Sequence, residues 1–143
     1  MIVRAIENAF KHGKERGWAK TYWAFDIHGT ILKPNHRRDV IATEFYPHAI
    51  EVMQMLSERT DIIRILYTCS YPHEIEQYLE LFRSHGIHFH YVNSNPEVAD
   101  GGYGYYKEKF YFNVLFEDKA GFSGEEDWME VKKALEKIDV KQG

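Results

Sequence analysis

A chain of 143 residues has room for one domain with a buried core, but not for a catalytic fold joined to a large second domain. Its net charge of -4 provides no positive field for a phosphate backbone, so we expect no nucleic-acid partner. A single cysteine excludes an internal disulfide, and without an apolar leader or a run of roughly 20 apolar residues we expect a cytoplasmic protein that makes no membrane contact.

The first two predicted elements are a helix and a buried strand. Apolar residues recur at helical spacing from Val3 to Phe10, and the pattern ends at Gly17. An apolar strand follows at about residues 21 to 25, and directly after it comes Asp26-Ile27-His28-Gly29-Thr30. Parallel sheets bind ligands at the carboxyl ends of their strands, so we expect chemistry where this strand stops.

A second strand lies between two predicted helices. The polar turn at residues 32 to 39 is too short to be a domain, and Pro47 opens a helix that runs to about Arg59. The apolar run at residues 62 to 67 predicts a strand, and its end is again polar, because Thr68-Cys69-Ser70 follows it. Pro72 then opens a helix that stops near His85-Gly86.

Two further strands and a tail helix complete the pattern. They are predicted at residues 87 to 92, 110 to 116 and 125 to 138, with a loop rich in glycine and tyrosine at residues 100 to 106. Strands that alternate with helices predict one α/β domain over residues 1–143, a three-layer Rossmann-like fold with helices on both faces of a parallel sheet in order 4-1-2-3. The three polar strand ends, Asp26, Thr68 and Asp118, would then converge on one edge.

Four positions resemble the motifs of the haloacid dehalogenase-like (HAD) phosphohydrolases. The first motif of that superfamily is apolar-apolar-Asp-x-Asp-Gly-Thr, and residues 24 to 30 match it except that His28 replaces the second aspartate. Thr68 matches the second motif, Lys109 the third and Asp118 the fourth. The resemblance covers roughly residues 22 to 122 and is to the small branch of the superfamily that has no separate cap domain.

This resemblance implies a Mg²⁺-dependent phosphatase that acts on a small phosphate ester through an aspartyl-phosphate intermediate. Asp26 would be the nucleophile, and Thr68 and Lys109 would hold the phosphate oxygens. Mg²⁺ would bind Asp26, Asp118 and the backbone carbonyl of His28. Since no cap would cover the site, we also expect the chain to associate with itself.

The role of His28 has two interpretations. Histidine titrates near neutral pH, so it would replace the aspartate that usually carries the proton. Alternatively, the substitution leaves a non-catalytic or impaired protein that binds Mg²⁺ or phosphate. A second departure is Glu117, which stands before Asp118 where the family usually has another aspartate. Its longer side chain would still reach a water molecule on the metal.

Structural roles compete with each functional role. Asp26 could be a turn or helix-capping residue, and Thr68 and Ser70 could cap the helix that begins at Pro72. Lys107 competes with Lys109, and the spacing to Asp118 favours Lys109.

Three weaker signals lie in the second half of the chain. His88 and His90 would point to one face of a strand as a zinc pair, but no third ligand is evident. Residues 101 to 104 follow no strand and open no helix, so they are not a dinucleotide-binding motif. The tyrosine-rich loop would either border the site or be buried in a contact between subunits.

Overall fold

The chain folds around a four-stranded parallel sheet. The computed structural model describes residues 1–98 and 104–142. In chain order its elements are α1 (Ile2–Arg16), β1 (Thr21–Phe25), α2 (Ala49–Ser57), β2 (Ile62–Leu66), α3 (Pro72–Ser84), β3 (Tyr91–Val92), β4 (Val114–Phe116), the 3-10 turn η1 (Asp118–Ala120) and α4 (Asp127–Gln142).

Strand β1 lies inside the sheet, between two partners. It pairs in parallel with β2 along its whole length, from Thr21 opposite Ile62 to Phe25 opposite Leu66, and with β4 along its second half. β3 extends the sheet beyond β2. The order β3-β2-β1-β4 is the predicted order counted from the opposite edge, so the α/β class and the strand order are confirmed. Because all four strands point the same way, their carboxyl ends share one edge.

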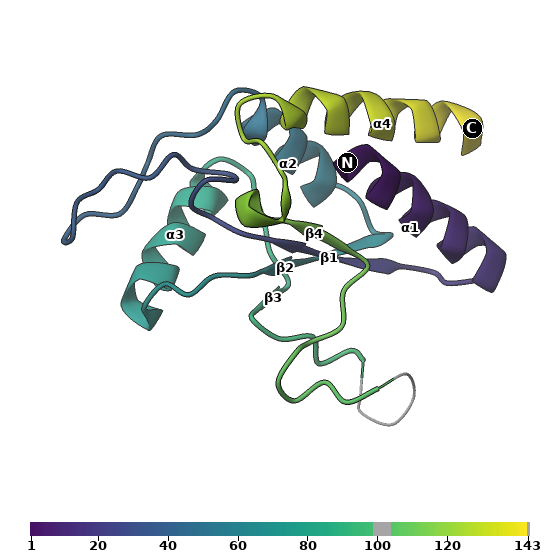
Figure 1. The fold of residues 1–143 in the computed structure, drawn as a ribbon, viewed down its shortest axis with the longest axis horizontal. Helices are drawn as coiled ribbons and strands as arrows, with labels where there is room; N and C mark the ends of the chain where they lie inside the picture. Colours follow the sequence, from purple (N-terminus) through teal and green to yellow (C-terminus); the bar gives the residue numbers. More distant parts are fainter. Residues whose placement is uncertain (99–103, 143) are drawn as a thin grey trace.

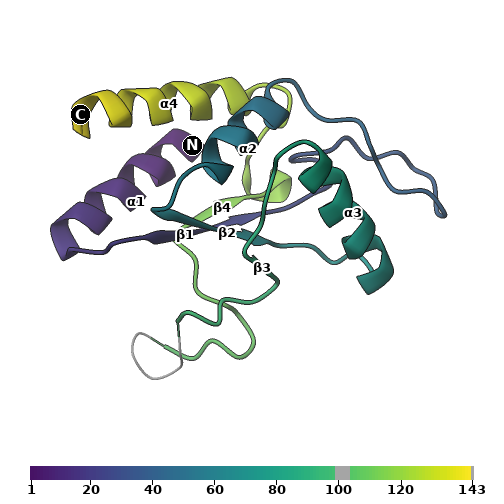
Figure 2. The same cartoon turned by 180° about the vertical axis from the view of Figure 1, so that it is seen from behind.

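Helices cover one face of this sheet. α1, α2 and α4 lie together over it in both views, and α3 stands apart from them near the carboxyl edge (Figures 1 and 2). The described part of the segment between β3 and β4 lies on the other face and contains no helix (Figure 1). This layer is irregular because its sequence has no helical repeat of apolar residues.

Stacked aromatic rings join β1, β4 and α4. The ring centroid of Phe116 lies 4.5 Å from that of Phe25 and 5.7 Å from those of Trp23 and Trp128. All four side chains are fully buried. Burial of such a side chain contributes about 1.5 to 3 kcal/mol, so these rings fix the strand ends on which the polar residues stand. Asp26 follows Phe25 directly.

Two helices have bounds that differ from the prediction. α2 begins at Ala49 and not at Pro47, because His48 has a φ of +68° and a left-handed residue cannot be part of a right-handed helix. α4 begins at Asp127 and continues to Gln142, four residues beyond the predicted end at residue 138.

The last two strands are shorter than predicted. β3 keeps only Tyr91–Val92 of residues 87 to 92, and β4 keeps only Val114–Phe116 of residues 110 to 116. Asn113 ends the pairing with β1, since its side-chain Oδ1 accepts the N–H of Tyr22 at 2.8 Å in place of a backbone carbonyl. The chain before Asn113 is thereby free to leave the sheet.

Residues 33 to 48 form a short flap between β1 and α2. The Lys33 N–H donates to the Glu44 carbonyl at 2.8 Å, and an isolated bridge pairs Leu32 with Phe45. The flap is far too short for a cap domain. Among the residues that the structure describes, no helix is both long and apolar enough to cross a membrane.

Candidate functional site

Three strands carry polar side chains to one cavity at the carboxyl edge of the sheet. Asp26 follows β1, Thr68 follows β2 and Asp118 follows β4, and all three line a cavity of about 540 Å³. Its other lining residues are His28, Pro34, Tyr67, Cys69, Glu117 and Lys119. The structure therefore brings together the predicted residues Asp26, His28, Thr68 and Asp118.

Three carboxylates form an acidic group in this cavity. One oxygen from each of Asp26, Glu117 and Asp118 lies within 4.8 Å of the others. Burial raises the pKa of Asp26 from 3.8 to about 7, a hydrogen bond from the Ile27 backbone opposes this rise, and the charges of Glu117 and Asp118 add to it. Asp26 also shares a hydrogen bond with Asp118. Repulsion among the carboxylates thus adds to the effect of burial on Asp26.

The acidic group fits a small divalent cation. Mg²⁺ prefers oxygen ligands in an octahedron, in which ligand oxygens stand about 3 to 4.2 Å apart. Oxygens already within 4.8 Å of one another need only small side-chain movements to reach that geometry. A bound cation would also relieve the repulsion that raises the pKa of Asp26. The predicted carbonyl ligand, on His28, belongs to the turn that follows Asp26.

Gly29 allows this turn to pass close to Asp118. The φ of Gly29 is +81°, a conformation that favours glycine, and a Cβ at this position would lie 2.5 Å from Oδ2 of Asp118. Helix α4 contacts the same turn, because Nε1 of Trp128 donates a hydrogen bond to the carbonyl of Thr30 at 2.9 Å. The carboxylate of Asp118 can therefore occupy its position only because residue 29 has no side chain.

The backbone of Thr68 is held by a side chain that the sequence analysis did not single out. The N–H of Thr68 donates to Oδ1 of Asn93 at 2.9 Å, and Nδ2 of Asn93 donates back to the Thr68 carbonyl at 2.7 Å. The N–H of Ser70 donates to Oγ1 of Thr68 at 3.2 Å. Because that bond uses the oxygen as an acceptor, and Ser70 can be the donor in the bond between the two hydroxyls, the hydroxyl hydrogen of Thr68 can be donated to a ligand.

Thr68 and Ser70 do not cap helix α3. The residue at the cap position is Tyr71, and its N–H donates to the carboxylate of Glu74 at 3.0 Å. Oγ1 of Thr68 and Oγ of Ser70 lie 2.9 Å apart and bond to each other instead. The two hydroxyls therefore stand at the end of β2 without a structural role in the helix.

His28 is bonded to the buried hydroxyl of Tyr78. Its Nε2 lies 2.7 Å from that hydroxyl, and the two rings meet edge to face at 5.3 Å between centroids. The same hydroxyl accepts the N–H of Ala42 in the flap at 3.2 Å. Burial lowers the pKa of His28, and the charge of Glu74 opposes that change, so the neutral ring is favoured. Tyr78 thereby connects His28 to both α3 and the flap.

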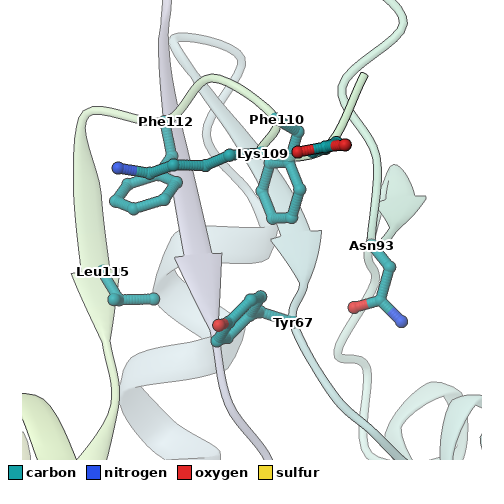
Figure 3. A pocket seen from close by; sticks show the side chains of 7 residues that line it. Tyr67, Asn93, Lys109, Phe110, Phe112 and Leu115 are labelled. Carbon is teal, nitrogen blue, oxygen red and sulfur yellow. The ribbon is translucent and has the colours of Figure 1, made fainter. Parts of the chain in front are cut away.

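The predicted lysine lies outside the cavity that contains Asp26. Lys109 lines a second cavity, where its Nζ lies 5.7 Å from the ring centroid of Phe112 (Figure 3). The competing residue Lys107 lines a hollow beside residues 93 to 98. In the described part of the chain, the lysine that lines the cavity of Asp26 is Lys119.

One weaker signal from the sequence, the zinc pair, finds no support in the described residues, and a second lies largely outside them. Nδ1 of His90 accepts the backbone N–H of Arg64 at 3.0 Å, so this ring supports β2, and the acidic group is the one metal-ligand cluster among those residues. Of the loop predicted at residues 100 to 106, residues 100 to 103 lie outside the part of the chain that the structure describes.

Three residues of the site were not predicted from the sequence, although the sequence contains a feature that points to each of them. Lys119 directly follows Asp118, and Asn93 follows the apolar end of a predicted strand. Tyr78 shares the helical spacing of the apolar residues Ile75 and Phe82, and a tyrosine hydroxyl on that buried face needs a hydrogen-bond partner. Local sequence could not show that Asn93 bonds to Thr68 or that Tyr78 bonds to His28.

Comparison with known proteins shows the fold and leaves the activity open. No protein-family model and no curated protein matches this chain. Among solved structures, it is similar to a conserved protein coded by a locus of Bacteroides thetaiotaomicron, with a TM-score of 0.63 and 21% identity over 83% of this chain and 92% of that one. At this identity the similarity shows the α/β fold alone.

Proposed function

We propose that this chain is a Mg²⁺-dependent phosphatase that hydrolyses a small phosphate ester through an aspartyl-phosphate on Asp26. The observation that carries the proposal is the acidic group, which shares one cavity with the hydroxyl of Thr68 at the ends of three parallel strands. Phosphoryl transfer of this kind needs a carboxylate nucleophile, oxygen ligands for a metal and donors for the phosphate oxygens. The resemblance to the HAD motifs supports the same reaction.

The metal would be held by the acidic group and the carbonyl of His28. When bound, Mg²⁺ would draw negative charge from the phosphate and keep the carboxylate of Asp26 ionised. Glu117 would either bind the cation directly or hold one of its water molecules. Every one of these donors is an oxygen, which is the ligand type that Mg²⁺ prefers.

The reaction would proceed in two displacements at phosphorus. An oxygen of Asp26 attacks, the bond to the ester oxygen breaks, and the leaving alcohol takes up a proton. Water then attacks the aspartyl-phosphate, the bond to Asp26 breaks, and inorganic phosphate is released. Thr68 donates its hydroxyl to a phosphate oxygen, and Lys119 offsets charge because it lines the same cavity.

His28 would carry the proton in both displacements. Its neutral ring, which burial favours, can accept a proton from the attacking water and return it to the next leaving group. The hydrogen bond with Tyr78 engages Nε2, so the exchange falls to Nδ1. Tyr78 is in this proposal a positioning residue, because it sets the orientation of the ring and touches no reacting atom.

The same hydrogen bond favours a second candidate function. If the bond with Tyr78 keeps His28 turned away from the phosphate, the cavity retains its metal and phosphate ligands but lacks a proton carrier. The chain would then be a non-catalytic protein that binds Mg²⁺ or phosphate.

Two measurements on the same variants separate these functions. Hydrolysis of a broad set of phosphate esters is measured with Mg²⁺ for the wild type and Asp26→Asn, and Mg²⁺ affinity is measured by calorimetry, with Asp118→Asn added. Glu15→Gln, an exposed change on α1, is the control. The phosphatase predicts turnover that Asp26→Asn abolishes. Wild-type turnover no higher than that of Asp26→Asn would identify the binding protein, and unchanged Mg²⁺ affinity in both variants would refute the metal site.

A further inference from the structure

A second cavity adjoins the one that contains Asp26. We call it the aromatic cavity; its volume is about 410 Å³ and it is lined by Tyr67, Asn93, Glu108, Lys109, Phe110, Phe112 and Leu115. This volume falls within the range of small-molecule sites, about 300 to 1,000 Å³. Tyr67 lines both cavities, and 43% of its surface remains exposed. The two cavities are therefore neighbours that share Tyr67.

The walls of the aromatic cavity are mainly flat rings. The centroid of Phe110 lies 6.0 Å from that of Tyr67 and 5.9 Å from that of Phe112, with both pairs edge to face. In Figure 3 the rings of Phe110 and Phe112 stand on one side of the space, and Tyr67 and Leu115 stand on the other. In an edge-to-face pair the edge of one ring covers one face of the other, and the ring faces that remain are what a flat ligand stacks on.

The two cavities differ in polarity. Carboxylates dominate the first, whereas the second has one acid, Glu108, and one base, Lys109, among its apolar side chains. Asn93 adds little polarity, because its amide is already committed to the backbone of Thr68. A phosphate monoester has the same division, with a charged end and an organic end.

The two cavities are lined by neighbouring residues of the chain. Tyr67 directly precedes Thr68, and adjacent residues are separated by about 3.8 Å between Cα atoms. Tyr67 lines both cavities, so a phosphate ester held at the hydroxyl of Thr68 can extend past Tyr67. The organic group of that ester would then continue into the aromatic cavity.

We propose that the aromatic cavity binds the organic group of the phosphate ester, and that this group contains a flat aromatic ring. The proposal rests on the phosphatase function above, because that function places the phosphate beside Thr68. The ring would contact Tyr67, Phe110 and Phe112, and the charges of Glu108 and Lys109 would face its polar substituents. Aryl groups and nucleobases share this chemistry.

The first test compares two esters that differ only in the flatness of the ring. Benzyl phosphate and cyclohexylmethyl phosphate both release a primary alcohol, so leaving-group chemistry is matched. Stacking on two rings predicts a kcat/KM about tenfold higher for benzyl phosphate. Phe110→Leu and, separately, Phe112→Leu should reduce this ratio towards one. Tyr71→Leu removes an aromatic ring that is 70% exposed and lines neither cavity, and should leave the ratio unchanged.

A second test requires no turnover. Saturation-transfer NMR without Mg²⁺ should detect benzyl alcohol on the wild type more strongly than cyclohexylmethanol, and Phe110→Leu should remove the difference. Turnover with equal kcat/KM for the two esters and equal NMR signals would overturn the aromatic proposal while the phosphatase stands. No turnover on any ester would overturn the phosphatase, and the NMR preference would still support a ring-binding cavity.

A final experiment tests whether the ring that binds belongs to a nucleobase or to an aryl group. Adenosine 5′-monophosphate carries a nucleobase and O-phosphotyrosine carries an aryl group, and their kcat/KM values are compared in the wild type and in Phe110→Leu. A loss of about tenfold in the variant for either compound supports the proposal and identifies that source. Equal values in both proteins for both compounds would count against it.

Discussion

Nε2 of His28 and the hydroxyl of Tyr78 lie 2.7 Å apart, although 50 positions separate the two residues in the sequence. The contact ties the one position that departs from the first HAD motif to a hydroxyl that is itself buried and bonded to Ala42 of the flap. His28 is therefore part of the packing between the site and α3. Its chemistry cannot be altered without altering that contact.

The first prediction concerns the proton. His28→Ala should lower kcat/KM, which reports the first displacement, for esters of poor leaving groups by about 10²- to 10⁴-fold and affect an activated aryl phosphate much less, because only a poor leaving group needs protonation. His28→Asp should retain or raise the activity. The measurement is kcat/KM against the pKa of the leaving alcohol. A loss of equal size for every ester would show that His28 acts through structure alone.

The second prediction concerns the stability of the metal-free protein against pH. The pKa of Asp26 is about 7 in the folded state, against 3.8 for an aspartate exposed to water, so the unfolded chain loses this proton first and stability should fall from about pH 4 to pH 7. Asp26→Asn removes the cost of ionising this carboxylate in the folded protein. It should stabilise the metal-free protein at pH 8 by about 1 to 2 kcal/mol, allowing for solvent screening, and have little effect at pH 4.

Thermal unfolding with a chelator present, from pH 4 to pH 8, checks this prediction. The quantity to compare is the difference in Tm between the wild type and Asp26→Asn. A difference that stays the same across the whole range would contradict the raised pKa of Asp26. Adding Mg²⁺ at pH 8 should stabilise the wild type more than the variant, since the cation binds the ionised carboxylate.

The third prediction separates two lysines. Lys119→Ala should lower kcat/KM for all phosphate esters by about tenfold or more, because this ammonium lines the cavity in which the phosphate would bind. Lys109→Ala should alter kcat/KM only for esters whose organic group reaches the aromatic cavity. Steady-state kinetics on ring-bearing and small alkyl esters gives both values. The opposite result would restore Lys109 to the role that the family resemblance implies.

The fourth prediction uses two glycines that both have positive φ. Gly29→Ala should weaken Mg²⁺ binding at least tenfold, because the new Cβ would displace the carboxylate of Asp118. Gly17→Ala is the matched control: its φ is +69° but nothing lies within 4 Å, so it should cost only about 1 kcal/mol of stability. Calorimetry and thermal unfolding measure the two effects. Equal Mg²⁺ affinities would show that Asp118 is not a ligand.

Local sequence was sufficient to predict the ends of three strands and the order of the strands in the sheet. The apolar runs that end at Asp26, Thr68 and Asp118 predicted three strand ends on one edge, and the structure places all three around one cavity. The topology also followed, since short connections and right-handed crossovers leave few arrangements for alternating strands and helices.

The remaining parts depend on contacts between distant residues. Asn113 shortens β4 because its side chain takes the place of a backbone carbonyl opposite Tyr22, 91 positions away. The pattern of apolar residues from 110 to 116 does not reveal that a side chain replaces the backbone carbonyl as acceptor. The chain before Asn113 lies on the face of the sheet opposite α1, α2 and α4 (Figure 1).

The hydrogen bond from Trp128 to the carbonyl of Thr30 has a consequence for the order in which the protein assembles. The two residues are 98 positions apart. A ribosome adds roughly 5 to 20 residues per second, so the turn that carries Asp26 exists for about 5 to 20 s before its indole donor is synthesised. Throughout that interval the Thr30 carbonyl lacks this donor. The turn beside Asp26 therefore reaches its final form late, when α4 closes over the sheet.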